Sequence, residues 1–165
     1  IIIRRKLPPR RRTASEPAPD YWRELWLRWR EAREDDRIRA ANIRALRGKR
    51  VLIVDPEEKS SRVLSWRLHR LRCSIQRART AYHALNLAKE HEPEVLVADA
   101  LLPDMTAVEF YQSLPRQDVP VVFVGALRDQ WDQLRALGPN VACLSKPFEP
   151  EDVASLAGMI LRRSA

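Results

Sequence analysis

The feature that most constrains the fold is an apolar run at residues 94–99 that ends in a carboxylate. Residues 95–98 are Val-Leu-Val-Ala, with no alternation of apolar and polar side chains. Such a run is typical of a strand covered on both faces, as in a parallel sheet. Asp99 stands where this strand should end, and sites in open α/β sheets lie outside the carboxyl ends of the strands. We therefore expect a site at Asp99, the alternative being a solubilising turn residue.

Strands and helices are expected to alternate through the rest of the chain after Arg50. Strands are expected at 51–55, 74–78, 94–99, 119–124 and 141–144, and helices at 56–71, 81–90, 107–114, 127–137 and 151–162. Five alternations of strand and helix predict an α/β fold with a doubly wound parallel sheet. Cys73 and Cys143 lie far apart without metal-type spacing, so we interpret both as reduced core residues.

The basic charge of the chain is concentrated in its first fifty residues. They hold sixteen Lys and Arg against seven Asp and Glu, whereas residues 51–165 hold fourteen against fifteen. This asymmetry points to a basic segment that seeks phosphate, acidic protein or anionic lipid. We expect an irregular Pro/Arg-rich arm at 1–19, a long amphipathic helix at 20–48, and a globular domain at 49–165.

The helix predicted at 20–48 carries large apolar side chains on one face. Trp22, Leu25, Trp26 and Trp29 recur at helical spacing. They either pack on the chain's own domain or form an interface with a partner or a membrane surface. The candidate interaction residues are these four side chains and the basic residues of the arm, namely Arg4, Arg5, Lys6, Arg10, Arg11 and Arg12. We expect neither a membrane-spanning segment, because no apolar run is long enough, nor a signal peptide.

Three short segments of the globular part resemble the response-regulator receiver family. They are Val51-Leu52-Ile53-Val54-Asp55, then Asp99 with Leu102-Pro103-Asp104-Met105, then Ser145-Lys146-Pro147-Phe148. The resemblance covers residues 50–163 and implies a flavodoxin-like, five-stranded sheet of order 2-1-3-4-5. It also implies that Asp99 is the phosphoacceptor, Lys146 the active-site lysine and Asp55 the first residue of an acidic pair.

Three positions depart from the pattern of that family. The second acid of the pair, a Mg²⁺ ligand, is matched by Pro56, which has no ligand atom in its side chain. The switch hydroxyl after the fourth strand is matched by Gly125, and the switch aromatic on the fifth strand by Cys143. These losses favour a degenerate phosphoacceptor site made of Asp55, Asp99 and Lys146, without metal, cofactor or catalysis.

The prediction from these features is a non-catalytic pseudo-receiver that serves as a structural subunit. Its arm and Trp helix would attach it to protein subunits of a larger complex, for example a bacterial photosynthetic or respiratory one. We expect a cytoplasmic protein, peripheral on the inner membrane, with no output domain after its last helix and no specific nucleic acid partner. The alternatives are a phosphorylated single-domain response regulator and, with less support, a nucleic-acid-associated regulator.

Overall fold

The computed structural model describes residues 35–164 of the 165-residue chain. The chain divides into two compact units between Arg37 and Ile38, and the second unit holds the whole sheet. Residues 35–46 are helical, and residues 38–46, here called the leading helix, belong to the second unit. The described residues include neither the arm nor the predicted interaction side chains of Trp22, Leu25, Trp26 and Trp29.

Five strands alternate with five helices beyond the leading helix, as the sequence predicted. The strands are β1 (Arg50–Val54), β2 (Ser74–Ala78), β3 (Val95–Asp99), β4 (Val121–Val124) and β5 (Val141–Leu144). The helices are α2 (Glu58–His69), α3 (Ala81–His91), α4 (Ala107–Gln112), α5 (Arg128–Arg135) and α6 (Pro150–Ser164). Every strand pair is parallel and the order is β2-β1-β3-β4-β5, which confirms the predicted topology.

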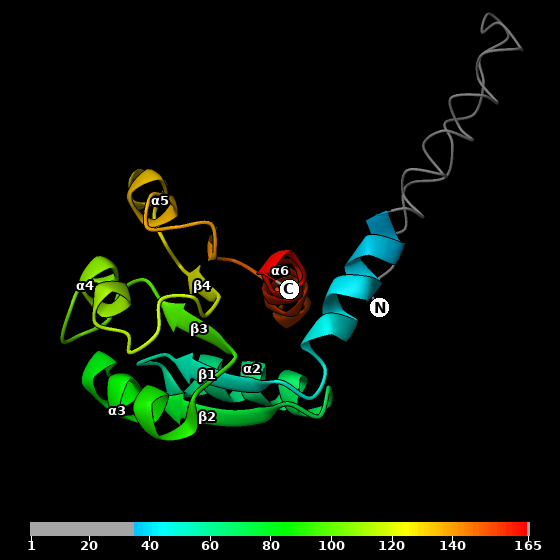
Figure 1. Ribbon diagram of the computed structural model, residues 1–165, viewed down its shortest axis with the longest axis horizontal. Coiled ribbons are helices and arrows are strands. Elements are labelled where there is room, and N and C mark those ends of the chain that lie inside the picture. Colours follow the sequence, from blue (N-terminus) through cyan, green and yellow to red (C-terminus); the bar gives the residue numbers. More distant parts are fainter. Residues whose placement is uncertain (1–34, 165) are drawn as a thin grey trace, which may run out of the picture. The chain divides into compact units, whose positions relative to one another are not determined.

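Helices cover both faces of this sheet, which is why the strands other than the edge strand β2 are almost continuously apolar. Figure 1 shows α3, α4 and α5 along one side of the sheet and α6 on the other. On the first side Leu52, Leu96 and Phe123 pack with α3, α4 and α5. On the other side Val51 and Val97 belong to a second buried cluster with α2 and α6. The two apolar layers hold the strand ends of β1 and β3 in fixed register.

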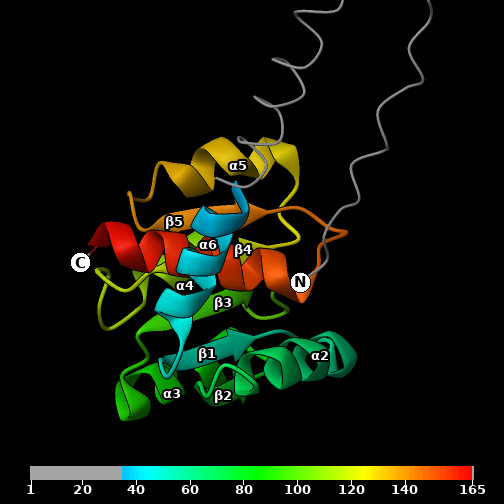
Figure 2. The same ribbon diagram turned by 90° about the vertical axis from the view of Figure 1, so that its right-hand side faces the viewer.

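The leading helix is built into the second of these clusters. Its residue Leu46 is 1% exposed and packs in the same core as α2 and α6. The helix ends at a turn in which Gly48 adopts a left-handed φ of 74°, a conformation that glycine tolerates best. Figure 2 shows the helix crossing α6. Residues 38–46 therefore form part of the folded unit.

The boundaries differ from the prediction at two prolines. Pro56 does not open a helix, because α2 begins at Glu58 and Glu57 before it is extended. Pro120 lies before β4, which begins at Val121. Proline has no N–H to give to a ladder, yet the Pro120 carbonyl accepts a bond of 2.9 Å from the N–H of Leu96.

Candidate phosphoacceptor site

Asp55 and Asp99 meet at the carboxyl ends of two neighbouring strands. β1 and β3 pair with Val54 opposite Ala98, so the residue after each partner stands at the same edge of the sheet. Asp55 is 7% exposed and Asp99 is 6% exposed. Buried carboxylates are rare unless something compensates their charge, which marks this edge as a candidate site.

Each carboxylate is fixed by the backbone of its own loop. The N–H of Glu57 donates to Asp55 Oδ1 at 2.8 Å, and the N–H of Leu101 donates to Asp99 Oδ1 at 2.8 Å. The second oxygen of Asp99 accepts from Lys146 Nζ at 3.3 Å. The structure thus brings together the three residues that the sequence proposed for the site. Burial raises the pKa of Asp55, and the negative charge of Asp99 raises it further. Together these effects outweigh the hydrogen bond from the backbone of Glu57, which lowers this pKa.

Gly125 determines where the side chain of Lys146 can lie. This glycine follows β4 with a left-handed φ of 73°. A Cβ atom added to it would lie 3.1 Å from Lys146 Cε and 3.5 Å from Lys146 Cδ. The aliphatic stem of the lysine therefore occupies the space beside Gly125, and its ammonium group reaches Asp99. The other departure, Cys143, is half-buried on β5 opposite Phe123, and burial raises the pKa of its thiol.

The residues around the two carboxylates provide a reduced set of metal ligands. Among residues 35–164 no group of three or more His, Cys, Asp or Glu side chains is placed to hold a metal. The carbonyl of Pro56, which has replaced the second acid, accepts from Arg79 Nη2 at 3.3 Å. Mg²⁺ is commonly bound by only one or two carboxylates, with waters and phosphate oxygens completing its shell. Asp55 and Asp99 fit that smaller role, because a cation would relieve the repulsion between them.

A further carboxylate, Asp104, organises the loop after Asp99, and the sequence analysis gave it no role. Its oxygens accept from the N–H groups of Ala81 and Tyr82, each at 2.9 Å, and so cap the first turn of α3. Burial opposes its ionisation, but the two donors outweigh that effect and lower the pKa of Asp104. No local signal could reveal this cap, because Asp104 lies more than twenty positions from the N–H groups of Ala81 and Tyr82 that it accepts from.

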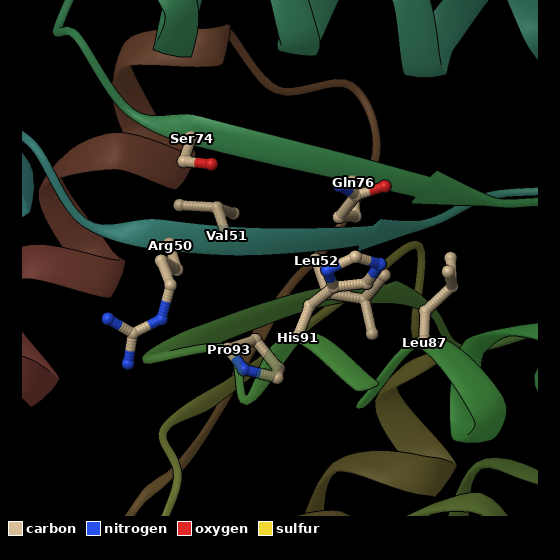
Figure 3. Close-up of a pocket in the computed structure, with 8 residues that line it drawn as sticks. All are labelled: Arg50, Val51, Leu52, Ser74, Gln76, Leu87, His91 and Pro93. Atoms are coloured by element: carbon tan, nitrogen blue, oxygen red, sulfur yellow. The ribbon is translucent and has the colours of Figure 1, made fainter. Parts of the chain in front are cut away.

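A small pocket lies at the opposite end of β1 and β2 and does not belong to this site. Figure 3 shows that Arg50, Val51 and Leu52 line it together with side chains from β2, the end of α3 and the following loop. The remaining lining residues are Ser74, Gln76, Leu87, His91 and Pro93. Arg50 is already engaged there, since its Nε donates to the carbonyl of Glu92 at 3.0 Å.

Comparison with known proteins shows which family this chain belongs to. The model of the response regulator receiver domain matches residues 51–157, which is more than half of the chain. The chain belongs to the response regulator receiver family. It is 30% identical over 121 residues to the alkaline phosphatase synthesis transcriptional regulatory protein PhoP of Bacillus subtilis, covering 70% of this chain and 50% of that protein. A probable transcriptional regulator ycf27 of Guillardia theta is 29% identical over 118 residues, covering 70% and 46%.

Solved receiver structures share the fold. A putative response regulator from Chloroflexus aurantiacus matches with a TM-score of 0.63 and 24% identity, over 71% of this chain and 100% of that one. The chemotaxis response regulator CheY4 of Vibrio cholerae matches with a TM-score of 0.57 and 23% identity, over 71% and 98%. The chain spans about half the length of the curated relatives that it matches.

These relatives correct the functional prediction made from the sequence. The prediction of a structural subunit with a pseudo-receiver fold was wrong, because the relatives are named as transcriptional regulators and the family is that of response regulators. The prediction relied on three departures from the family pattern, at Pro56, Gly125 and Cys143. It gave too little importance to the three matching residues, Asp55, Asp99 and Lys146. Membership of a family of regulators does not test whether this chain lacks catalytic activity. The absence of catalysis therefore stays a prediction. Within the described part of the chain, no helix is long and apolar enough to cross a membrane.

Proposed function

We propose that this chain is a response regulator whose receiver accepts a phosphoryl group on Asp99. The observation that carries the proposal is the buried Asp99 carboxylate with Lys146 Nζ 3.3 Å from one oxygen and Asp55 beside it. A carboxylate at a strand end with a fixed cation is arranged to attack phosphorus and to stabilise the charge on the transferred group. The donors would be a small acyl phosphate or the phosphohistidine of a sensor kinase.

The transfer needs few protein groups. An oxygen of Asp99 forms a new bond to phosphorus, while the bond from phosphorus to the donor's oxygen or nitrogen breaks and its electron pair leaves with the donor. Lys146 offsets the charge on the phosphoryl oxygens from its position 3.3 Å from Asp99. Asp55 and Asp99 would hold Mg²⁺, which supplies additional charge neutralisation when bound. Since Pro56 contributes no carboxylate, we expect this chain to need more Mg²⁺ than a receiver with two adjacent acids.

The test is chemical labelling of the full chain with acetyl phosphate and Mg²⁺, read by intact mass and peptide mapping. We expect a gain of one phosphoryl group, located on Asp99, that is absent from an Asp99→Asn variant. Asp118→Asn is the matched control, because Asp118 is an exposed carboxylate paired with Arg116 on the surface and its loss should leave labelling unchanged. An unlabelled wild-type chain, with both acetyl phosphate and a panel of sensor kinases, would reject the proposal.

We also propose that the basic arm contacts an anionic membrane surface on the cytoplasmic face. The support is the charge excess of the first fifty residues, where each Lys or Arg near such a surface contributes about 1 kcal/mol of binding. Co-sedimentation with phosphatidylglycerol vesicles, compared with an Arg10, Arg11 and Arg12 to Ser variant, tests this. Binding to a protein partner or to DNA instead of vesicles would contradict it.

A further inference from the structure

The leading helix and α6 pack closely at Gly158, where a Cβ atom would not fit. A Cβ atom added to Gly158 of α6 would lie 1.7 Å from the carbonyl oxygen of Asn42 and 2.4 Å from its carbonyl carbon. Gly158 is buried, as are its neighbours Ala157 and Ala154. No side chain separates the two helices at this point, so neither can move far without displacing the other.

Polar contacts fix the leading helix to α6 on both sides of this crossing. Arg39 Nη2 donates to Asp152 Oδ1 at 2.8 Å in the first turn of α6. Arg162 Nη1 donates at 2.8 Å to the side-chain oxygen of Asn42, which is 6% exposed. A charged donor on a buried amide is among the stronger side-chain hydrogen bonds. The leading helix is therefore attached to both ends of α6.

The first turn of α6 is connected to the phosphoacceptor site over a short segment. Lys146, which contacts Asp99, stands four residues before the start of α6 at Pro150. Asp152 accepts from the N–H of Glu149 at 3.0 Å as well as from Arg39. A continuous path thus runs from Asp99 through Lys146 and the backbone at Glu149 to Asp152 and Arg39.

A phosphoryl group on Asp99 would act on the first member of this path. It brings a charge of about −2 and three acceptor oxygens to the oxygen that Lys146 now contacts. The lysine stem lies beside Gly125, and a phosphoryl group on Asp99 would redirect its ammonium group and so act on the segment that follows Lys146. Neither Gly125 nor Cys143 has a hydroxyl or an aromatic ring that could follow the phosphoryl group. Lys146 provides a polar connection between the site and the segment that leads into α6.

From these contacts we propose that the leading helix is the output element of the receiver, and that it senses Asp99 through Lys146, α6 and the Arg39–Asp152 ion pair. The inference rests on the proposed phosphorylation of Asp99 and names its regulatory consequence. The signal leaves the domain at the amino-terminal side of residue 38, where the sequence continues into the segment with Trp22, Trp26 and Trp29.

The test measures amide hydrogen exchange of residues 38–46 in the full chain, with and without acetyl phosphate and Mg²⁺. We expect phosphorylation to change exchange by about fivefold or more in the wild type, because coupling between sites is typically about 5- to 150-fold. Arg39→Ala should be labelled normally but show a smaller change in exchange than the wild type, because the contacts of Asn42 with α6 stay in place. Arg44→Ala, which removes an exposed arginine of the same helix, should behave like the wild type.

The outcomes separate the two proposals. Labelled Asp99 with unchanged exchange at residues 38–46 overturns the output role and leaves the phosphoacceptor role intact. An equal response in Arg39→Ala and the wild type overturns the route through Asp152. The same change in exchange in an Asp99→Asn chain shows that the effect does not originate at the site. If Asp99 is never labelled, the proposed function fails and the inference fails with it.

Discussion

Replacing Gly158 by alanine tests the packing of the leading helix, because the expected sign is opposite to the usual one. In an ordinary helix interior, alanine is more favourable than glycine by about 0.8–1.0 kcal/mol. Here the new Cβ atom would lie 1.7 Å from the carbonyl oxygen of Asn42, whereas real Cβ contacts are not closer than 3.0 Å. The helices must therefore separate locally by at least the difference, 1.3 Å.

That separation weakens contacts whose approximate contributions to the free energy of unfolding follow from general principles. The hydrogen bond from Arg162 to Asn42 involves a charge and is worth about 1.5–3 kcal/mol. Overpacking of a buried contact costs about 1–3 kcal/mol, and Leu46 at the end of the same helix loses part of its burial. After the gain in helix propensity is subtracted, we expect Gly158→Ala to lower the free energy of unfolding by about 1.5–5 kcal/mol.

Urea denaturation of the full chain, followed by circular dichroism at 222 nm, measures this change. Gly138→Ala is the matched control, since its Cβ would lie 3.4 Å from the hydroxyl of Tyr111, an ordinary contact, and we expect a change within about 0.5 kcal/mol. Hydrogen exchange should rise at residues 38–46 in Gly158→Ala alone. A Gly158→Ala chain as stable as the wild type, with unchanged exchange there, would refute the close packing of the two helices.

Three other substitutions have expected outcomes. Gly125→Thr restores the hydroxyl of the family, but its Cβ would meet Lys146 at 3.1 Å on a backbone with φ of 73°. It should lower both the unfolding free energy, by about 1–2 kcal/mol, and the labelling rate of Asp99, as urea and acetyl phosphate assays measure. Asp55→Asn should stabilise the chain at pH 7: the folded pKa of Asp55 is raised above 3.8, so its charge reduces stability as pH rises through that value. The gain, from urea titrations at pH 7 and pH 4, should shrink at the lower pH. Thr106→Ala removes the capping box of α4 and should cost about 1 kcal/mol in the same denaturation assay.

The strands and helices were predictable because their signals are local. The predicted bounds 74–78 and 141–144 match those of β2 and β5. The stretch 141–144 is apolar, as is typical of a buried strand, whereas the edge strand β2 is a mixed polar and apolar stretch. The position of Asp99 followed from the rule that sites lie at the carboxyl ends of parallel strands. The trio with Asp55 and Lys146 came from the family pattern, and the structure brings the three together.

The long-range contacts could not be predicted from the sequence. Gly158 in α6 gives no signal that its missing Cβ admits the backbone of Asn42, because the contact joins residues more than one hundred positions apart. The cap of α3 by Asp104 could not be predicted either, because the residues in contact are more than twenty positions apart. The wrong prediction of a structural subunit had another origin. The loss of single side chains, as at Pro56 and Gly125, does not by itself show that Asp99 can no longer accept a phosphoryl group.

The two edges of the sheet have a consequence for how this protein behaves at high concentration. β2 and β5 stand at the ends of the strand order, so one side of each has backbone groups that no strand of this sheet engages. Such edges invite self-association through added strands. β5 has only four residues, and β2 carries Arg77, whose guanidinium pairs with Glu58 beside the edge. A short edge and a charged one both oppose fibril-like stacking, which favours a chain that stays dispersed in a crowded cell.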